Sequence, residues 1–318
     1  MPNLPKRKLG RTDLEVSVLS YGTADLGRGR LRRRRQSEER AGRILNAVLD
    51  SGINLIDTSI DYVAAEERIG RYISHRRAEY YLATKCGCKA GWGPWWRTRI
   101  PKVRYPHVFT RENVIAGVEQ SLRRLRTDYV DLVALHHPPA RAELEASGVI
   151  EALVDLKQQG KVRWIGSSAR LPELPGHIAM GVFDVFQVPY SALHRENEPL
   201  LTAAAQSGAG VIIRSPLVRG APNDWLHAPA YIFSRAEVVR RWRDARLDDL
   251  LDGAGTVAFM LRFALSHPDM DTALFGTLNP EHLRANLETL AKGPLPVDVL
   301  AEAKRRLAAA GSAPATLE

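Results

Sequence analysis

A short apolar run followed by a longer amphipathic stretch recurs eight times along this chain, and this repeat limits the possible folds more than any other feature. The runs are rich in Leu and β-branched residues and almost continuously apolar, which is typical of parallel strands buried on both faces. We expect strands over residues 16–21, 54–57, 80–85, 129–136, 162–166, 185–188, 210–214 and 272–275. Eight strand–helix units that close on themselves form a (β/α)8 TIM barrel, and an open doubly wound sheet is the alternative.

The stretches between these runs show helical periodicity and end at residues that commonly cap helices. Gly52, Gly160 and Gly208 each follow a helix end, where a left-handed residue is favoured, whereas Thr110 and Asn279 precede helix starts. We expect helices over residues 37–50, 64–74, 111–125, 144–159, 198–207, 256–266 and 280–290, with a short, weakly patterned one between 171 and 181.

The composition indicates a folded protein with a sizeable core. The 318 residues are 45% hydrophobic and 25% charged, close to the average for globular domains, which excludes global disorder. No Pro/Gly/Ser-rich linker divides the chain, so we interpret residues 1–318 as a single domain. The basic N-terminus leads into a polar segment, and no run approaches the ~18 apolar residues of a spanning helix. We therefore expect a cytoplasmic protein with no membrane partner.

A net charge of +9 raises the question of an anionic partner, because six arginines crowd into residues 28–35. We interpret this cluster as a solvated loop, partly neutralised by Glu38 and Glu39, rather than as a docking patch for nucleic acid or a membrane. Attraction of an anionic substrate or cofactor is an intermediate interpretation. No aromatic residues alternate with these arginines, so we expect no nucleic-acid partner.

The two cysteines carry no recognisable motif. Cys86 and Cys88 are separated by one glycine, which is neither the C-x-x-C redox spacing nor half of a four-cysteine zinc site. We therefore expect free thiols and no metal site.

Four different ionisable groups stand at or just after the ends of consecutive predicted strands. Asp57 ends the second strand with Tyr62 five residues on, Lys85 ends the third and His136 ends the fourth. The carboxyl ends of barrel strands form the rim where such barrels hold their active sites, so we expect the four side chains to converge there. The following His137 should alternate to the opposite side of the strand, and we assign it no chemistry.

This set of groups suits proton delivery to a carbonyl oxygen. A lysine cation lowers the pKa of a nearby tyrosine, so Lys85 can tune Tyr62, and Asp57 compensates the buried ammonium. His136 can donate a hydrogen bond to the substrate oxygen as negative charge develops on it. Each residue alone also has a structural explanation, as an ion pair, a packing tyrosine or a buried histidine. Four such residues together at one rim favour a catalytic role.

Two long insertions follow predicted strands, at residues 86–109 and 215–235. Loops of this length at the rim of a barrel are usually functional. The first carries Trp92, Trp95 and Trp96, for which local packing and lining of a substrate pocket are both open. It also carries Arg97 and Arg99, which together with Arg214 predict an anionic substrate.

Motifs along nearly the whole chain resemble those of the aldo-keto reductase superfamily. DTSIDY at 57–62 is similar to the family's D-T-A-x-x-Y, ATK at 83–85 to its lysine motif and DLVALHHP at 131–138 to its D-L-x-x-x-H-x-P. KLGRTDLEVS at 8–17 resembles the N-terminal hairpin that closes the barrel bottom. The other matching segments are YGTADLG, GKVRWIGSS, FDVFQVPYS, RSPLVRG and GTLNPEHLRANLE.

The resemblance implies an oxidoreductase that moves hydride between a nicotinamide cofactor and a carbonyl or alcohol substrate, an aldehyde, a ketone or a sugar-like compound. It implies a catalytic tetrad of Asp57, Tyr62, Lys85 and His136, with Tyr62 as general acid in reduction and general base in oxidation. The cofactor, NADP(H) first and NAD(H) second, would lie across the barrel mouth without a Rossmann fold. No oligomeric state is predicted.

The same resemblance implies the residues that hold the cofactor. Ser168 and Gln187 would hold the nicotinamide carboxamide, Arg214 would lie at the nicotinamide ring, and Ser215 and Leu217 would meet the pyrophosphate. The adenosine end would contact Gly276, Thr277, His282 and Asn286.

This chain departs from the family pattern at several of these positions. Ala169 replaces an asparagine that would hold the carboxamide, and Arg214 replaces an aromatic residue. Near the 2′-phosphate, Gly276 and His282 stand where Lys and Arg are usual, so the preference for NADP(H) is weakened. Arg284 can compensate only if it shares a helix face with His282.

Two other functions stay open from the residues. Lys85 at a strand end is a candidate Schiff-base nucleophile for an aldolase-type reaction. The departures at Ala169 and Arg214 also fit a nucleotide-binding regulatory subunit with little turnover.

Overall fold

Eight parallel strands form a closed barrel in the computed structural model, which describes residues 4–27, 34–91, 106–218 and 232–317. The strand order around the barrel is β10-β3-β4-β5-β6-β7-β8-β9, which confirms the predicted (β/α)8 fold. The barrel strands are β3 (Leu19–Gly22), β4 (Leu55–Asp57), β5 (Tyr81–Cys86), β6 (Val130–His136), β7 (Val162–Ser168), β8 (Val185–Pro189), β9 (Gly210–Arg214) and β10 (Thr272–Phe275).

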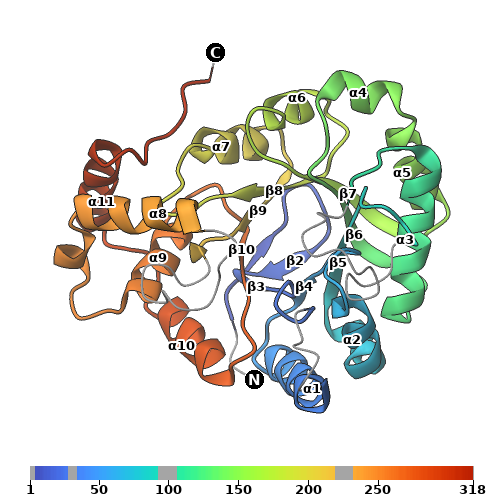
Figure 1. Ribbon diagram of the computed structural model, residues 1–318, viewed down its shortest axis with the longest axis horizontal. Helices are drawn as coiled ribbons and strands as arrows, with labels where there is room; N and C mark the ends of the chain where they lie inside the picture. The colour runs from blue at the N-terminus through green and yellow to red at the C-terminus, as the bar shows by residue number, and fades with distance from the viewer. Residues whose placement is uncertain (1–3, 28–33, 92–105, 219–231, 318) are drawn as a thin grey trace.

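Helices surround the barrel on its outside (Figure 1). In chain order they are α1 (Arg34–Asp50), α2 (Ala65–Tyr72), η2 (Ser74–Glu79), α3 (Arg111–Leu125), α4 (Arg141–Ala146), α5 (Val149–Gln158), α6 (Leu174–Ala179), α7 (Glu198–Gln206), α8 (Ile232–Asp244), η5 (Leu247–Leu250), α9 (Thr256–Leu265), α10 (Pro280–Ala291) and α11 (Val297–Ala309). None of them, within the part of the chain described, is long and apolar enough to cross a bilayer.

The predicted caps are present. Thr110 accepts a hydrogen bond from the backbone nitrogen of Asn113 at the start of α3, and Asn279 accepts one from Glu281 at the start of α10. Gly160 and Gly208 have φ of +72° and +81°, the left-handed conformation expected after a helix.

Two expectations about element boundaries were wrong, and two helices were not predicted. The predicted strand 16–21 is two strands, because the chain leaves the hairpin strand β2 (Glu15–Ser17) before it enters β3. The predicted helix 144–159 is interrupted at Gly148, where φ is +68°. Helices α8 and α11 were not predicted.

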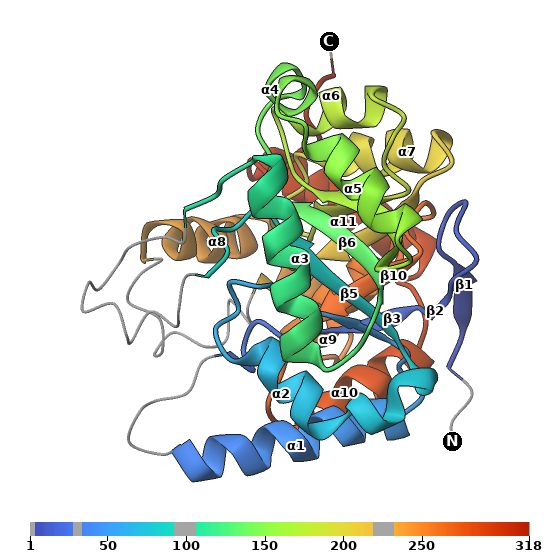
Figure 2. The ribbon, with the colours of Figure 1, turned by 90° about the vertical axis from the view of Figure 1, so that its right-hand side faces the viewer.

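An N-terminal hairpin closes one end of the barrel. Strand β1 (Lys6–Lys8) pairs antiparallel with β2, and Leu9, Leu14 and Val16 insert among inward-facing barrel side chains with no exposed surface. Figure 2 shows the hairpin at one end of the barrel and α8 at the opposite end. The strands run toward the end that the hairpin leaves open, so their carboxyl ends are available for a site.

Gly10 lets the hairpin turn approach the barrel closely. Its φ is +52°, and a Cβ there would overlap the backbone nitrogen of Gly210 on β9. We expect Gly10→Ala to lower the free energy of unfolding by at least about 2 kcal/mol, from backbone strain and overpacking combined. Gly253→Ala is the control, because φ there is +72° but nothing lies within 4 Å of the added Cβ. Equal losses in urea unfolding would show that the close approach is unimportant.

Candidate active site

Three neighbouring strands bring the predicted ionisable residues to one rim. Asp57 ends β4, Lys85 is the penultimate residue of β5, and His136 ends β6. All three side chains are buried, with at most 7% of their surface exposed. Tyr62 follows β4 in the loop that leads to α2, and its ring lies edge-on to that of His136 with the centroids 6.1 Å apart. The convergence expected from the sequence is therefore present.

Asp57 and Lys85 form a buried ion pair. The Lys85 ammonium donates to Asp57 Oδ2 at 2.6 Å and to the carbonyl oxygen of Thr58 at 2.8 Å. The other carboxylate oxygen of Asp57 accepts from Gln187 Nε2 at 2.6 Å. Burial opposes the charge on Lys85, but Asp57, Tyr62 and Asp61 together outweigh it, so the pKa of Lys85 is raised and the side chain stays an ammonium.

The Tyr62 phenol sits beside this ammonium. Lys85 Nζ lies 5.0 Å from the centroid of the Tyr62 ring. Burial raises the pKa of Tyr62, and the pull of Lys85 toward the phenolate only partly offsets it, while the carboxylates of Asp57 and Asp61 act in the same direction as burial. Lys85 thus acts in the expected direction, but the net change is opposite to the expected lowering. A protonated phenol is the form that a general acid needs.

His136 is held as a neutral imidazole. Burial lowers its pKa well below the ordinary value, and the nearby Lys85 cation adds to the effect. Its Nδ1 faces the Oγ of Ser59 at 3.5 Å, the Oδ1 of Asp61 at 3.5 Å and the Sγ of Cys88 at 3.4 Å. Nε2 lies on the other edge of the ring from these contacts.

His137 does not follow the strand alternation that we expected. The strand ends at His136, and His137 has φ of +53°, which turns its ring back onto that of His136. The two rings stack with centroids 4.4 Å apart. The alternation of side chains along a strand does not apply to His137, because this residue lies outside the extended strand.

The ends of β7, β8 and β9 offer polar atoms suited to a ligand. The Oγ of Ser168, the Oε1 of Gln187 and the Nε and Nη2 of Arg214 are buried and have no hydrogen-bond partner among the described residues. Buried polar atoms are normally hydrogen-bonded, so these four atoms are available to a ligand. A hydroxyl and an amide oxygen fit a carboxamide group such as that of nicotinamide. Burial lowers the pKa of Arg214 to about 10, which leaves it a cation at neutral pH.

The turn after β9 and the start of α10 hold the remaining predicted cofactor residues. Ser215 has φ of +61° and accepts from the backbone nitrogen of Val218, which forms a tight turn that includes Leu217. At the β10–α10 junction, Thr277 Oγ1 lies 3.3 Å from His282 Nδ1.

The residues at the β10–α10 junction differ in how far they are exposed. Asn286 is buried, whereas His282 and Arg284 are exposed. Gly276 packs so closely that a Cβ would lie 3.0 Å from the carbonyl oxygen of Gly22.

Several predicted residues lie outside the described part of the chain. They are the pocket candidates Trp92, Trp95 and Trp96, the arginines Arg97 and Arg99, and residues 28–33 of the arginine cluster.

Sequence reasoning missed four residues that contact His136, which are Ser59, Asp61, Cys88 and His107. Cys88 and His107 belong to the stem of the first long insertion, and nothing in their spacing indicates that they approach the end of β6. For Cys88 and His107, the available sequence signal was the glycine of the C-G-C motif. This residue, Gly87, takes φ of +95° and redirects the chain after β5.

Comparison with known proteins identifies the family. The model of the aldo/keto reductase family matches residues 18–306. The chain belongs to this family. The uncharacterized oxidoreductase YqkF of Bacillus subtilis (strain 168) is 26% identical over 299 residues, which cover 89% of this chain and 90% of YqkF. L-galactose dehydrogenase of Arabidopsis thaliana is 26% identical over 312 residues, which cover 92% of this chain and 90% of the plant protein.

The solved structures give the same result. The holo form of aldo-keto reductase AKR11C1 from Bacillus halodurans superposes with a TM-score of 0.79 at 26% identity, covering 96% of each chain. This chain is therefore an oxidoreductase of the aldo/keto reductase family.

The Asp57–Lys85 pair gives a stability prediction. We expect Asp57→Asn to cost about 3 kcal/mol of unfolding free energy, because it leaves a buried ammonium without its anion. The double variant Asp57→Asn/Lys85→Met contains no unpaired charge, so it should be more stable than Asp57→Asn alone. Chemical denaturation of the wild type, both single variants and the double variant measures the coupling, and additive losses would contradict it.

Proposed function

We propose that this protein reduces an aldehyde, ketone or sugar-like carbonyl with hydride from NAD(P)H, and catalyses the reverse oxidation, with Tyr62 as general acid and base. The observation that carries the proposal is the buried Asp57–Lys85 pair beside a protonated Tyr62 phenol and a neutral His136. Family membership supports the reaction class.

Each side chain has a separate task in this proposal. When bound, the reduced nicotinamide supplies the hydride to the carbonyl carbon. The oxygen then gains negative charge and takes the phenolic proton of Tyr62, so an alcohol forms. Lys85 stabilises the resulting phenolate, and Asp57 holds Lys85 in place through the 2.6 Å contact. His136 orients the carbonyl oxygen with a hydrogen bond from Nε2.

Unpaired atoms at three strand ends support the nicotinamide site. Ser168 and Gln187 would hold the carboxamide, and the Arg214 guanidinium would lie at the ring. Gln187 also bonds Asp57, so the same residue links cofactor and tetrad. The Ser215–Val218 turn with Leu217 would receive the pyrophosphate. The positive charge of Arg214 supports an anionic substrate. We also propose that residues 1–318 form a single domain.

The other two functions fit less well. A Schiff-base nucleophile must be a neutral amine, whereas the carboxylate of Asp57 holds Lys85 as an ammonium. The burial and close arrangement of four ionisable groups at one rim favour turnover over a purely regulatory role. The oxidoreductase relatives also favour an enzyme.

We expect Tyr62→Phe to lower the turnover number for carbonyl reduction by about 10²–10⁴-fold, the range for loss of a general acid. The ring keeps its place against His136, so the dissociation constant of the nucleotide should stay within about twofold of wild type. Nucleotide oxidation with a panel of aldehydes and ketones measures the first quantity, and calorimetric titration the second. Unchanged turnover in Tyr62→Phe or Lys85→Met proteins would overturn the role assignment.

NADP(H) is the cofactor we propose first, with NAD(H) second. His282 and Arg284 supply positive charge near the proposed adenosine site, but both are exposed and Arg284 lies 3.9 Å from Glu288. Exposed charge pairs contribute about 0–1 kcal/mol, so we expect NADPH to bind less than about tenfold more tightly than NADH. Separate calorimetric titrations test this. Binding of neither nucleotide would refute the proposed cofactor, and a strong preference for NADH would refute the order.

A further inference from the structure

The chain folds into a short antiparallel ribbon immediately after β5. Cys88 and His107 face each other across this ribbon, which is closed by hydrogen bonds from Lys89 N to Pro106 O (2.9 Å) and from Val108 N to Gly87 O (2.6 Å). Two residues far apart along the chain are therefore held side by side at the rim.

Asn113 of α3 fixes both arms of this ribbon. Its amide nitrogen donates to the carbonyl oxygens of Cys88 (3.2 Å) and Val108 (2.7 Å), and its amide oxygen accepts from Ala90 N (2.8 Å). Side chains on a ribbon held in this way lose little conformational entropy when they bind a ligand.

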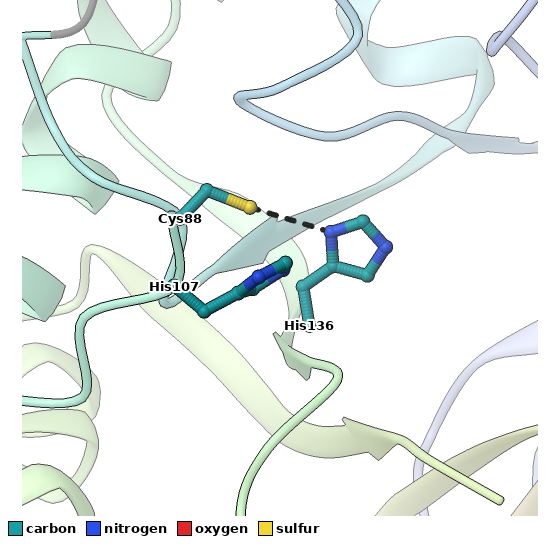
Figure 3. Close-up of side chains that lie close together, drawn as sticks. All are labelled: Cys88, His107 and His136. Atoms are coloured by element: carbon teal, nitrogen blue, oxygen red, sulfur yellow. Dashed lines mark hydrogen bonds between the residues drawn. The ribbon is translucent and has the colours of Figure 1, made fainter. Parts of the chain in front are cut away.

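The ribbon brings a thiol and an imidazole to the ring of His136 (Figure 3). One ligand atom from each of Cys88, His107 and His136 lies within 4.8 Å of the other two. The Sγ of Cys88 is 3.4 Å from Nδ1 of His136, and the centroids of the two imidazole rings are 5.5 Å apart at 70°. Cys88 and His136 are buried and His107 is half-buried.

These three donors match the preferences of zinc. Zinc binds sulfur at about 2.3 Å and imidazole nitrogen at about 2.0–2.1 Å in tetrahedral geometry, which places sulfur and nitrogen about 3.5 Å apart. The observed 3.4 Å between Cys88 Sγ and His136 Nδ1 fits this geometry without rearrangement of that pair. Hard cations such as Mg²⁺ and Ca²⁺ prefer oxygen donors, so the set discriminates against them.

We propose that Cys88, His107 and His136 form a site for one zinc ion. On binding, a Zn–S bond replaces the S–H bond of Cys88, and the thiol proton leaves to solvent. The fourth position is left to water or to the carboxylate of Asp61, whose Oδ1 lies 3.5 Å from the same Nδ1.

The site shares one residue with the proposed reaction but does not depend on it. Zinc would occupy Nδ1 of His136, whereas the proposed reduction uses Nε2 on the other edge of the ring. Whether zinc binds can therefore be decided without any turnover, and failure of one proposal leaves the other standing.

Titration of the chelator-treated full chain with Co²⁺ tests the site. We expect one Co²⁺ per chain, with a thiolate-to-cobalt charge-transfer band and the visible bands of tetrahedral cobalt, both displaced by one equivalent of Zn²⁺. X-ray absorption of the zinc form should show one sulfur at about 2.3 Å and nitrogens at about 2.0 Å. A coordination shell without sulfur would overturn the proposal.

Matched variants locate the ligands. Cys88→Ser should abolish the charge-transfer band, whereas Cys86→Ser should keep it, because Cys86 lies in the apolar core outside the cluster. His107→Ala should weaken Zn²⁺ binding at least tenfold, about 1.4 kcal/mol. A band that survives in Cys88→Ser, or affinity unchanged in His107→Ala, would assign the ion to another place.

Discussion

The buried ion pair between Asp57 and Lys85 organises the rim of this barrel. An ammonium with 2% of its surface exposed is stable only beside an anion, and Asp57 supplies it. The same carboxylate also accepts from Gln187 on β8, across the barrel from β4 and β5. One carboxylate therefore fixes the relative positions of groups from three strands. The N-terminal hairpin closes the opposite end of the barrel.

The electrostatics around this pair keep the Tyr62 phenol and the His136 imidazole in their neutral forms. Lys85 draws the Tyr62 phenol toward ionisation, but burial and the carboxylates outweigh it. At His136, burial and the Lys85 cation both lower the pKa, because a second positive charge is unfavourable there. A phenol that retains its proton suits the proposed general acid, and a neutral imidazole beside it adds no further buried charge.

Residue patterns predicted most of the barrel and the convergence of the tetrad. Strands buried on both faces have a continuous apolar pattern, and a group at the carboxyl end of one must meet its neighbours. Helix α8 was not predicted, although Val238 and Trp242 are buried one helical turn apart, because the charged residues around them weaken the apolar pattern. The break between β2 and β3 was missed because apolar residues fill both the hairpin and the barrel strand. Periodicity cannot distinguish them.

Contacts made by the long insertions were beyond such reasoning, since a loop has no repeating geometry that relates its residues to the rim. The antiparallel pairing of Cys88 with His107 depends on the turn at Gly87 and on Asn113 of a neighbouring helix. As a result the two nitrogens of His136 face different surroundings. Nδ1 lies among a thiol, a hydroxyl and a carboxylate, and Nε2 lies on the opposite edge of the ring. Contacts at one nitrogen fix the orientation of an imidazole ring, so the groups around Nδ1 set the direction in which Nε2 points in the proposed reaction.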